Sequence, residues 1–396
     1  MASSATSQNA CSRAAELSGA SSASAAPTSS SAAIPSKKKP RIALFDNIKG
    51  IAILLVVLGH FCARIVGFTD SHLIYTTLTF IYFFHMPLFL FCSGLFAGKS
   101  WYKRHQAPSD KVLLYMILYL IFLGLIVVLD LVVFHKTPGV NPFVVTGAPW
   151  FMLVLGLFML MVPIMGSVRP ASFLAVSILL AVGSGVFLTE VGPLSVSRFF
   201  VYLPYFALGF YLQPESVEKL VDVLEARIGT IARIVLAAVM LAAIFAALYL
   251  LFTNTQLTFI KRISTGMNLL SVLSVRWHVD LWILALLRIV QYAAVFVMGA
   301  LVVLLCPKHK CFLTFMGERS FQVYIFHILI MYCISYYNWY EPLVAANRLW
   351  ILSPYVFAPI LTALLAWPKG PNNLVKDISD WTKKVTAPKD NPLVHR

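Results

Sequence analysis

The stretch Asp46–His60, DNIKGIAILLVVLGH, decides the fold of this 396-residue chain. It begins an apolar helix directly after the basic cluster at residues 37–41, yet it carries two ionisable side chains, Lys49 and His60. These two residues are eleven positions apart, so a helix places them on one face, about 16 Å apart along its axis. Ionisable side chains inside a helix that crosses a membrane mark a functional site by default.

The composition around this stretch is that of a membrane protein. Hydrophobic residues make up 59% of the chain and charged residues only 12%, about half the charged share of a soluble domain. Apolar segments of membrane-spanning length recur from Asp46 to Trp367. They predict an all-α, polytopic membrane protein. In such a chain the net charge of +15 indicates topology rather than nucleic-acid binding.

We expect about ten transmembrane helices, with both termini in the cytoplasm. The predicted spans are 44–66, 73–97, 111–134, 148–166, 171–190, 197–213, 230–252, 282–306, 318–338 and 349–367. Most Lys and Arg residues then lie on the cytoplasmic side, as the positive-inside rule requires. The expected location is a cell membrane, either a plasma membrane or a bacterial inner membrane.

Three regions follow from these spans. Residues 1–41, rich in Ala and Ser, are predicted to form a disordered cytoplasmic tail and lack the apolar core of a signal peptide. Residues 42–368 form the transmembrane domain, and residues 369–396 a cytoplasmic C-terminal tail. Within the domain, residues 213–233 predict an interfacial helix. Residues 253–281 predict a long external loop that is either re-entrant or a lid.

The cysteines give no sign of a disulfide framework or a metal centre. Six are scattered along the chain, and the group Cys306, His309 and Cys311 lacks a convincing fourth ligand. We therefore expect reduced thiols and no metal.

Two further histidines lie inside apolar segments. His85 is in FIYFFHMPLFLFCSGLF (80–96), and His327 shares a helix face with Tyr324. Because the second span runs antiparallel to the first, we expect His85 within a turn or two of His60 in depth. Each histidine is either functional or simply hydrogen-bonded to a neighbouring helix.

Polar residues also lie toward the opposite, outer ends of several spans. They are Asp130, Trp150, Glu190, Arg198 and Arg288. The charged ones either pair with one another or serve a site. Trp150 is either an aromatic anchor at the membrane interface or a substrate contact. Lys49, at the inner end, is either part of a site or a snorkelling interfacial lysine.

Five motifs occur in order along the chain. They are DNIKGIAILLVVLGH (46–60), FFHMPLF (83–89), PWF (149–151), SRFFVYLPYFALGFYL (197–212) and GERSFQVYIFH (317–327). In this order they resemble the membrane-embedded sugar O-acyltransferases of the acyltransferase-3 family, in particular its fucose 4-O-acetylase-like branch. The likeness covers nearly all of residues 44–340. It departs from the family at Glu318-Arg319, where a basic residue followed by asparagine is common.

The resemblance implies transfer of an acetyl or other short acyl group from cytoplasmic acyl-CoA, usually acetyl-CoA, to a hydroxyl of a cell-surface or lipid-linked glycan. The family's signature of a basic residue, a ten-residue gap and a histidine falls on Lys49 and His60. The histidine of the second motif falls on His85, and the arginine of the later helix on Arg198.

Acyl transfer to an alcohol requires a base for the hydroxyl proton and stabilisation of an oxyanion. We predict that His60 is the base or a transient carrier of the acyl group, and that His85 orients it or donates to the oxyanion. The residues predicted to bind CoA are Asp46, Lys49, Lys103 and Arg104. The residues predicted to bind substrate are Trp150, Arg198 and His327.

Two other classes of function stay open. A transporter of a lipid-linked sugar would use His60, His85 and His327 as a proton relay, although the chain shows no internal repeat. A non-catalytic partner in a glycan-assembly complex would turn over no acyl-CoA. We expect acyl-CoA, a glycan acceptor and membrane lipids as partners, and no nucleic acid.

Overall fold

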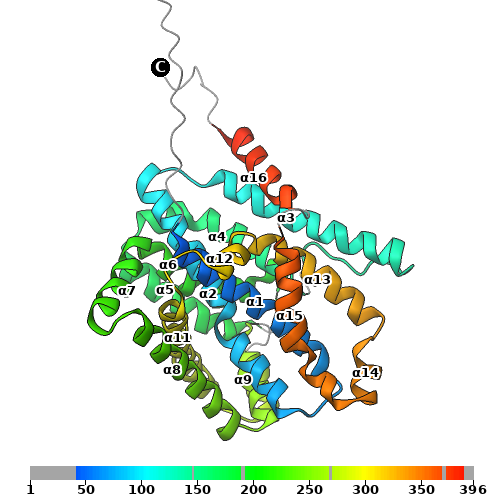
Figure 1. The fold of residues 1–396 in the computed structure, drawn as a ribbon. Coiled ribbons are helices and arrows are strands. Elements are labelled where there is room, and N and C mark those ends of the chain that lie inside the picture. Colours follow the sequence, from blue (N-terminus) through cyan, green and yellow to red (C-terminus); the bar gives the residue numbers. More distant parts are fainter. Residues whose placement is uncertain (1–41, 145–146, 189–191, 267–269, 368–371, 388–396) are drawn as a thin grey trace, which may run out of the picture. The chain divides into compact units, whose positions relative to one another are not determined.

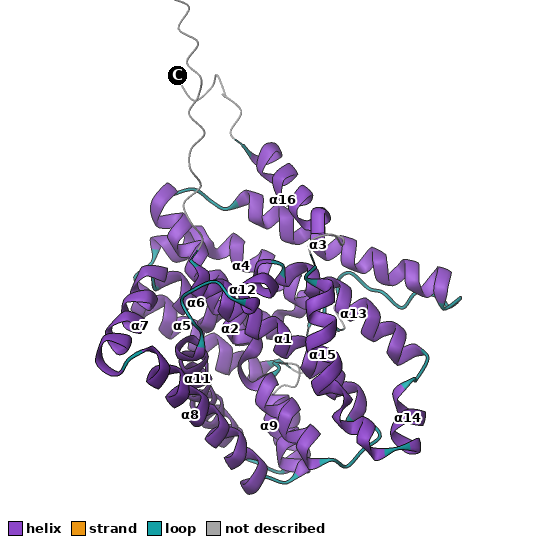
Figure 2. Ribbon diagram, in the orientation of Figure 1, coloured by secondary structure: helices purple, strands orange, loops and turns teal. Residues whose placement is uncertain are grey.

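The computed structural model describes residues 42–144, 147–188, 192–266, 270–367 and 372–387. The chain divides into Met1–Arg41 and Ile42–Arg396, and every described residue belongs to the second unit. The predicted disordered tail, residues 1–41, lies outside the described residues, as does Glu190. Helices joined by loops make up the described part of the chain, in which no strand occurs (Figure 2).

The helices follow the predicted spans closely (Figure 1). In chain order they are α1 (Ala43–Ile65), α2 (His72–Arg104), α3 (Ser109–Val128), the π-helical turn η1 (Leu129–Val133), α4 (Trp150–Ser167), α5 (Pro170–Phe187), the 3-10 turn η2 (Pro193–Ser195), α6 (Val196–Tyr211), α7 (Pro214–Ile228), α8 (Thr230–Leu251), α9 (Asn254–Ser264), α10 (Leu270–Trp277), α11 (Leu281–Leu305), α12 (Phe312–Glu318), α13 (Ser320–Tyr336), α14 (Tyr340–Ala346), the 3-10 turn η3 (Arg348–Leu352), α15 (Ser353–Leu365) and α16 (Asn372–Thr386). The prediction of an all-α, polytopic membrane protein is confirmed.

Most of the ten expected spans are helices long and apolar enough to cross a membrane. Among the described residues, eight helices are long and apolar enough to cross a membrane, or nine if α13 and α14, bent by 65°, form one span. The remaining predicted span, α6, has only 16 residues, about 24 Å against a hydrocarbon core of about 30 Å. Prolines shorten it, since Pro193 lies in the turn before α6 and Pro214 begins α7.

Glycines bring α1 and α2 into direct backbone contact with their neighbours. A methyl group on Gly94 or Gly98 of α2 would overlap a backbone carbonyl of α6, at Phe206 and Phe210 respectively. In the same way, a methyl group on Gly317 of α12 would overlap the Asp46 carbonyl of α1. Small residues at such crossings are typical of membrane helices, where close van der Waals packing drives association. The two helices that carry the main sequence motifs are thereby held at fixed positions.

The segment predicted as a long external loop, 253–281, contains the helices α9 and α10. α9 packs against α2, where the Thr79 hydroxyl donates to the carbonyl of Leu257 at 3.0 Å. At the end of α9, the Arg288 guanidinium donates to the carbonyl of Ile263 at 2.6 Å. This buried arginine therefore has a structural partner, and the segment is folded back against the helices.

Two helices lie outside the predicted membrane spans. The helix predicted within 213–233 is present as α7, and it ends at Gly229, whose φ of +81° favours glycine. The predicted C-terminal tail contains a helix, α16, which packs against α3.

Candidate functional site

His60 lies at the junction of two cavities. The first, here called the small chamber, has a volume of about 130 Å³. Its lining residues are His60, Tyr82, His85, Met86, Gly147, Ala148, Trp150, Arg198, Tyr202, Thr265 and Tyr324. The second, here called the vestibule, has a volume of about 490 Å³ and shares His60, Gly147 and Ala148 with the first. The predicted residues His60, His85, Trp150 and Arg198 therefore surround one chamber.

Three histidines from three helices lie close together at this junction. The rings of His60 (α1) and His327 (α13) have centroids 5.3 Å apart. The Tyr82 ring lies 6.4 Å from His60 and 5.1 Å from His85, so this tyrosine stands between the two histidines. Gly59 makes room for the contact, because a Cβ atom there would meet the Tyr82 ring at 3.0 Å.

Backbone carbonyls fix the tautomers of two of these histidines. Nδ1 of His85 lies 2.6 Å from the carbonyl oxygen of Ile81, and Nδ1 of His327 lies 2.8 Å from that of Val323. A carbonyl oxygen only accepts hydrogen bonds, so each neutral ring carries its proton on Nδ1 and presents a lone pair on Nε2. Nε2 of His327 is buried without a hydrogen-bond partner. The site thus holds oriented proton acceptors close to His60.

Arg198 supplies the positive charge of the small chamber. It is 3% exposed, and its Nε and Nη1 groups are buried without a hydrogen-bond partner. Its guanidinium carbon lies 4.9 Å from the ring centroid of Trp150, and Tyr202 stacks on the same indole at 5.1 Å. Trp150 is only 9% exposed, so little of its ring is free for a sugar. An unpaired buried guanidinium is suited to an anion or a developing oxyanion.

The end of α9 closes this chamber. Lys261 Nζ lies 5.7 Å from the Tyr82 ring centroid, and Thr265 lines the cavity. The Ser197 hydroxyl donates to the carbonyl of Gly266 at 3.0 Å, which ties this segment to α6. The predicted external loop therefore contributes part of the chamber wall.

The residues predicted to bind CoA lie at the other end of α1. Asp46 and Lys49 form an ion pair of 2.6 Å, and Lys49 Nζ lies 5.8 Å from the Phe96 ring centroid on α2. Lys103 and Arg104 are exposed in the last turn of α2, at this same end of the helix pair. The structure thus brings the four residues to one end, with Lys49 about 16 Å from His60 along the axis of α1.

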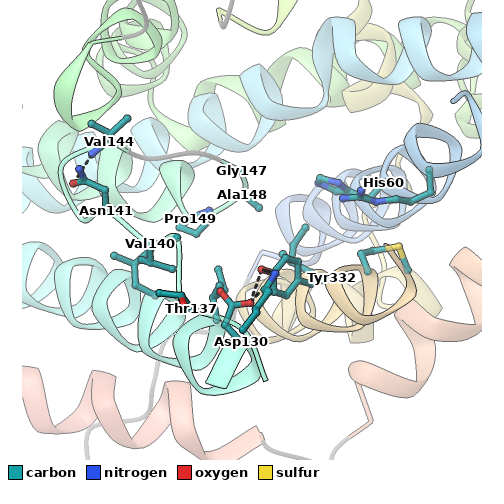
Figure 3. Close-up of a pocket in the computed structure, with 17 residues that line it drawn as sticks. His60, Asp130, Thr137, Val140, Asn141, Val144, Gly147, Ala148, Pro149 and Tyr332 are labelled. Carbon is teal, nitrogen blue, oxygen red and sulfur yellow. Dashed lines mark hydrogen bonds and ion pairs between the residues drawn. The ribbon is translucent and has the colours of Figure 1, made fainter. Parts of the chain in front are cut away.

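The vestibule is a cavity beside the last turns of α1 and α3 (Figure 3), with both polar and apolar residues in its lining. Its lining residues are His60, Arg64, Leu123, Ile126, Asp130, Lys136, Thr137, Gly139, Val140, Asn141, Val144, Gly147, Ala148, Pro149, Ile328, Met331 and Tyr332. Asp130, expected either to pair with one of the other outer charges or to serve a site, lies 3.1 Å from Lys136 Nζ. The hydroxyl of Tyr332 donates to Asp130 at 2.6 Å.

Sequence reasoning missed several residues of both cavities. Tyr82, Tyr202 and Tyr324 resemble ordinary core aromatics in apolar helices, and nothing in their spacing distinguishes them. Lys136 and Tyr332 are far apart in the sequence and carry no motif. Among the described residues, no group of three or more His, Cys, Asp or Glu side chains is placed to hold a metal ion.

Comparisons with known proteins cover most of the chain. A family model described as an acyltransferase domain matches residues 42–367. Nodulation protein NolL of Sinorhizobium fredii (strain NBRC 101917 / NGR234) is 33% identical over 126 residues, a match that covers 29% of this chain and 34% of NolL. The chain thus spans about a third of the length of this curated relative. No solved structure matches the chain.

Proposed function

Since this chain belongs to the acyltransferase-3 family, we propose that it transfers a short acyl group from acyl-CoA to a hydroxyl of a glycan. The observation that carries the proposal is the position of His60, which lines both the small chamber and the vestibule. A base placed there can contact an acyl group in one cavity and a hydroxyl in the other. The assignment to the fucose 4-O-acetylase-like branch stays a prediction.

The sizes of the two cavities support a division of roles. The small chamber, at about 130 Å³, is slightly smaller than a cavity of about 150 Å³ that holds benzene. An acetyl group fits such a space, whereas a sugar ring does not. The vestibule, at about 490 Å³, lies within the range of sites for larger ligands, about 300–1,000 Å³. We therefore assign the acyl group to the small chamber and the sugar to the vestibule.

The side chains around the chamber have roles in this reaction. His60 takes the proton of the acceptor hydroxyl as its oxygen attacks the thioester carbonyl. The unpaired N–H groups of Arg198 stabilise the oxyanion. The attack forms the new C–O bond, collapse of the intermediate restores the carbonyl and breaks the C–S bond, and His60 returns the proton to the leaving thiolate of CoA. His85 orients His60 through the Tyr82 ring that lies near both. It does not donate to the oxyanion, because its proton is on Nδ1, at the Ile81 carbonyl.

We also propose the side of the membrane from which each substrate approaches. With both termini in the cytoplasm, Asp46, Lys49, Lys103 and Arg104 lie at the cytoplasmic end, where the three cations suit the phosphates of CoA. The vestibule then faces the other side, toward a cell-surface or lipid-linked glycan. Acetyl is the expected acyl group because of the size of the small chamber.

The first experiment tests whether His60 is required for transfer. Membranes containing wild-type protein or His60→Ala receive labelled acetyl-CoA and cell-envelope glycans, and both CoA release and labelled glycan are measured. The matched control is His309→Ala, an exposed histidine at the opposite end of the helices. We expect transfer with the wild type and the control, and a loss of at least about 100-fold with His60→Ala.

Two results would refute this proposal. Transfer retained in His60→Ala would remove the base from the mechanism. Wild-type membranes that neither release CoA nor label a glycan, with several acyl-CoA donors supplied, would favour the transporter instead.

A further inference from the structure

The vestibule contains a hydrogen-bonded triad, built on one buried carboxylate, that the acyl-transfer chemistry does not use. We propose that Asp130, Lys136 and Tyr332 form an acceptor subsite that grips two neighbouring hydroxyl groups of a sugar ring. This inference rests on the proposed function, because it names the part of the acceptor that the vestibule recognises. It concerns residues 130–136 and α13, and not the sequence motifs around His60.

The three polar groups of the triad contact one another. Lys136 Nζ donates to the Tyr332 hydroxyl at 2.8 Å and lies 3.1 Å from Asp130 Oδ1. The Tyr332 hydroxyl donates to the same Oδ1 at 2.6 Å. All three residues line the cavity that His60 also lines. Figure 3 shows Asp130 and Tyr332 joined within this cavity, with His60 on another side of it.

These contacts leave one donor and one acceptor available. An ammonium group has three N–H donors, and Lys136 uses two of them within the triad. A carboxylate accepts at both oxygens, and the contacts of Asp130 within the triad all go to Oδ1. A vicinal diol matches this pair, because one hydroxyl accepts from Lys136 while its neighbour donates to Asp130.

The local backbone holds the triad rigidly. Asp130 lies in the π-helical turn η1, in which the Phe134 amide donates to the Leu129 carbonyl at 3.0 Å. Such wide turns often occur at functional sites. The Lys136 ammonium lies 5.4, 4.8 and 5.5 Å from the ring centroids of Phe134, Tyr332 and Tyr336. Cation–π contacts on several sides fix its position before a ligand arrives.

The burial of Asp130 distinguishes the triad from a simple surface ion pair. Asp130 is 2% exposed, and burial of a carboxylate costs free energy that its ion pair with Lys136 has to offset. In the Lys308–Asp222 pair the lysine side chain is as exposed as that of Lys136, but the carboxylate is open to solvent as well. A buried carboxylate whose lysine partner stays accessible, with spare hydrogen-bonding capacity inside a cavity, is suited to binding a polar ligand.

The test combines variants with altered sugars. Purified protein in lipid nanodiscs receives acetyl-CoA and a panel of methyl hexopyranosides, and transfer is followed by CoA release and mass spectrometry. The best acceptor is then compared with its monodeoxy analogues in wild type, Asp130→Asn and Tyr332→Phe. The matched control is Tyr336→Phe, whose hydroxyl donates to the Phe134 carbonyl at 3.1 Å and lies outside the lining of the cavity.

We expect Asp130→Asn and Tyr332→Phe to raise the half-saturating acceptor concentration by roughly 10- to 100-fold, as for hydrogen bonds to charged groups. The maximal rate should change by less than about threefold, because the triad binds substrate and does not act on the reacting atoms. Wild type should discriminate against one deoxy sugar by a similar factor, and Asp130→Asn should not. Tyr336→Phe should behave as wild type.

The outcomes separate the subsite from the proposed function. If Asp130→Asn and Tyr332→Phe lower the maximal rate or the melting temperature and leave the half-saturating concentration unchanged, the triad is structural and the inference is wrong. The inference is also wrong if Asp130→Asn still discriminates between the sugars as wild type does. If wild type neither releases CoA nor acylates any glycoside, the proposed function itself fails.

Discussion

Replacing Arg198 should separate activity from stability. In wild type this guanidinium is 3% exposed, faces the small chamber and has two N–H groups without a hydrogen-bond partner. Methionine has a similar length and no charge. We therefore expect Arg198→Met to fold at least as well as wild type and to lose most of its acyl transfer.

Two independent estimates of the loss in the maximal rate of transfer agree. A unit charge about 4 Å from a developing oxyanion, at an effective dielectric constant of about 20, contributes about 4 kcal/mol, equivalent to about a thousandfold in rate. Removal of one oxyanion donor in known enzymes slows turnover by roughly 10²- to 10³-fold. We expect the maximal rate of transfer by Arg198→Met to fall by roughly the same factor. Arg198→Lys should recover only part of it, because an ammonium cannot reproduce the planar fork.

The free energy of unfolding should respond to Arg198→Met differently from the rate of transfer. Removing a buried charge that lacks hydrogen-bond partners relieves its desolvation, and loss of the cation–π contact with Trp150, about 0.5–2 kcal/mol, offsets this gain. Arg288 is the matched control, since it is equally buried but donates to Ile263 and Gln291. Arg288→Met should lower the free energy of unfolding by about 1–3 kcal/mol, whereas Arg198→Met should leave it nearly unchanged.

The assay is CoA release and product formation at varied acetyl-CoA, alongside thermal melting in the same nanodiscs. A maximal rate that falls by less than about tenfold would refute the oxyanion role, because one donor is expected to contribute more than that. So would a loss confined to the half-saturating concentration of acetyl-CoA, because Arg198 would then bind the donor in its ground state.

Two further predictions concern packing and pH. Gly94→Ala should destabilise the protein by about 1–3 kcal/mol, because its methyl group would overlap the Phe206 carbonyl. Gly124 has open space around it, so the control Gly124→Ala should leave the stability unchanged. Melting temperatures that fall equally in the two variants would contradict this prediction. Burial opposes ionisation of Glu225, yet the hydrogen bond from Lys308 and the charge of Arg233 hold the pKa of this carboxyl below its ordinary value. Its ionised form therefore stabilises the protein above the ordinary Glu pKa and ceases to do so as pH falls through the lowered pKa. The difference in melting temperature between wild type and Glu225→Gln should be largest near pH 7 and vanish in acid, and a constant difference would count against it.

Most of the fold could be predicted from the sequence because the membrane imposes a simple rule. An apolar segment of the right length satisfies its backbone groups only as a helix, and each of the ten predicted spans lies on a helix. The span expected at 197–213 is the 16-residue helix α6, which is shorter than the other predicted spans because prolines bound it. The helices within 253–281 were not predicted, although Thr253 and Gln256 form a capping box at the start of α9. The hydrogen bonds that hold α9 against α2 and Arg288 are tertiary.

The candidate site, too, could be predicted only in part. His60, His85, Trp150 and Arg198 lie in sequence motifs, and the structure brings them to one chamber. The role of each residue stays a prediction. The triad could not be predicted, because Asp130 and Tyr332 are 202 residues apart and meet only through a π-helical turn.

That turn makes the vestibule sensitive to the number of residues in the chain as well as to their identity. A π-helical turn contains one residue more than the α-helical turn it replaces, and each residue in an α-helix advances the side chain by about 100°. Deleting one residue within Leu129–Val133 would restore regular winding and rotate Asp130 relative to Lys136. A single insertion or deletion here would therefore re-aim the polar wall of the vestibule while every side chain of the small chamber kept its place.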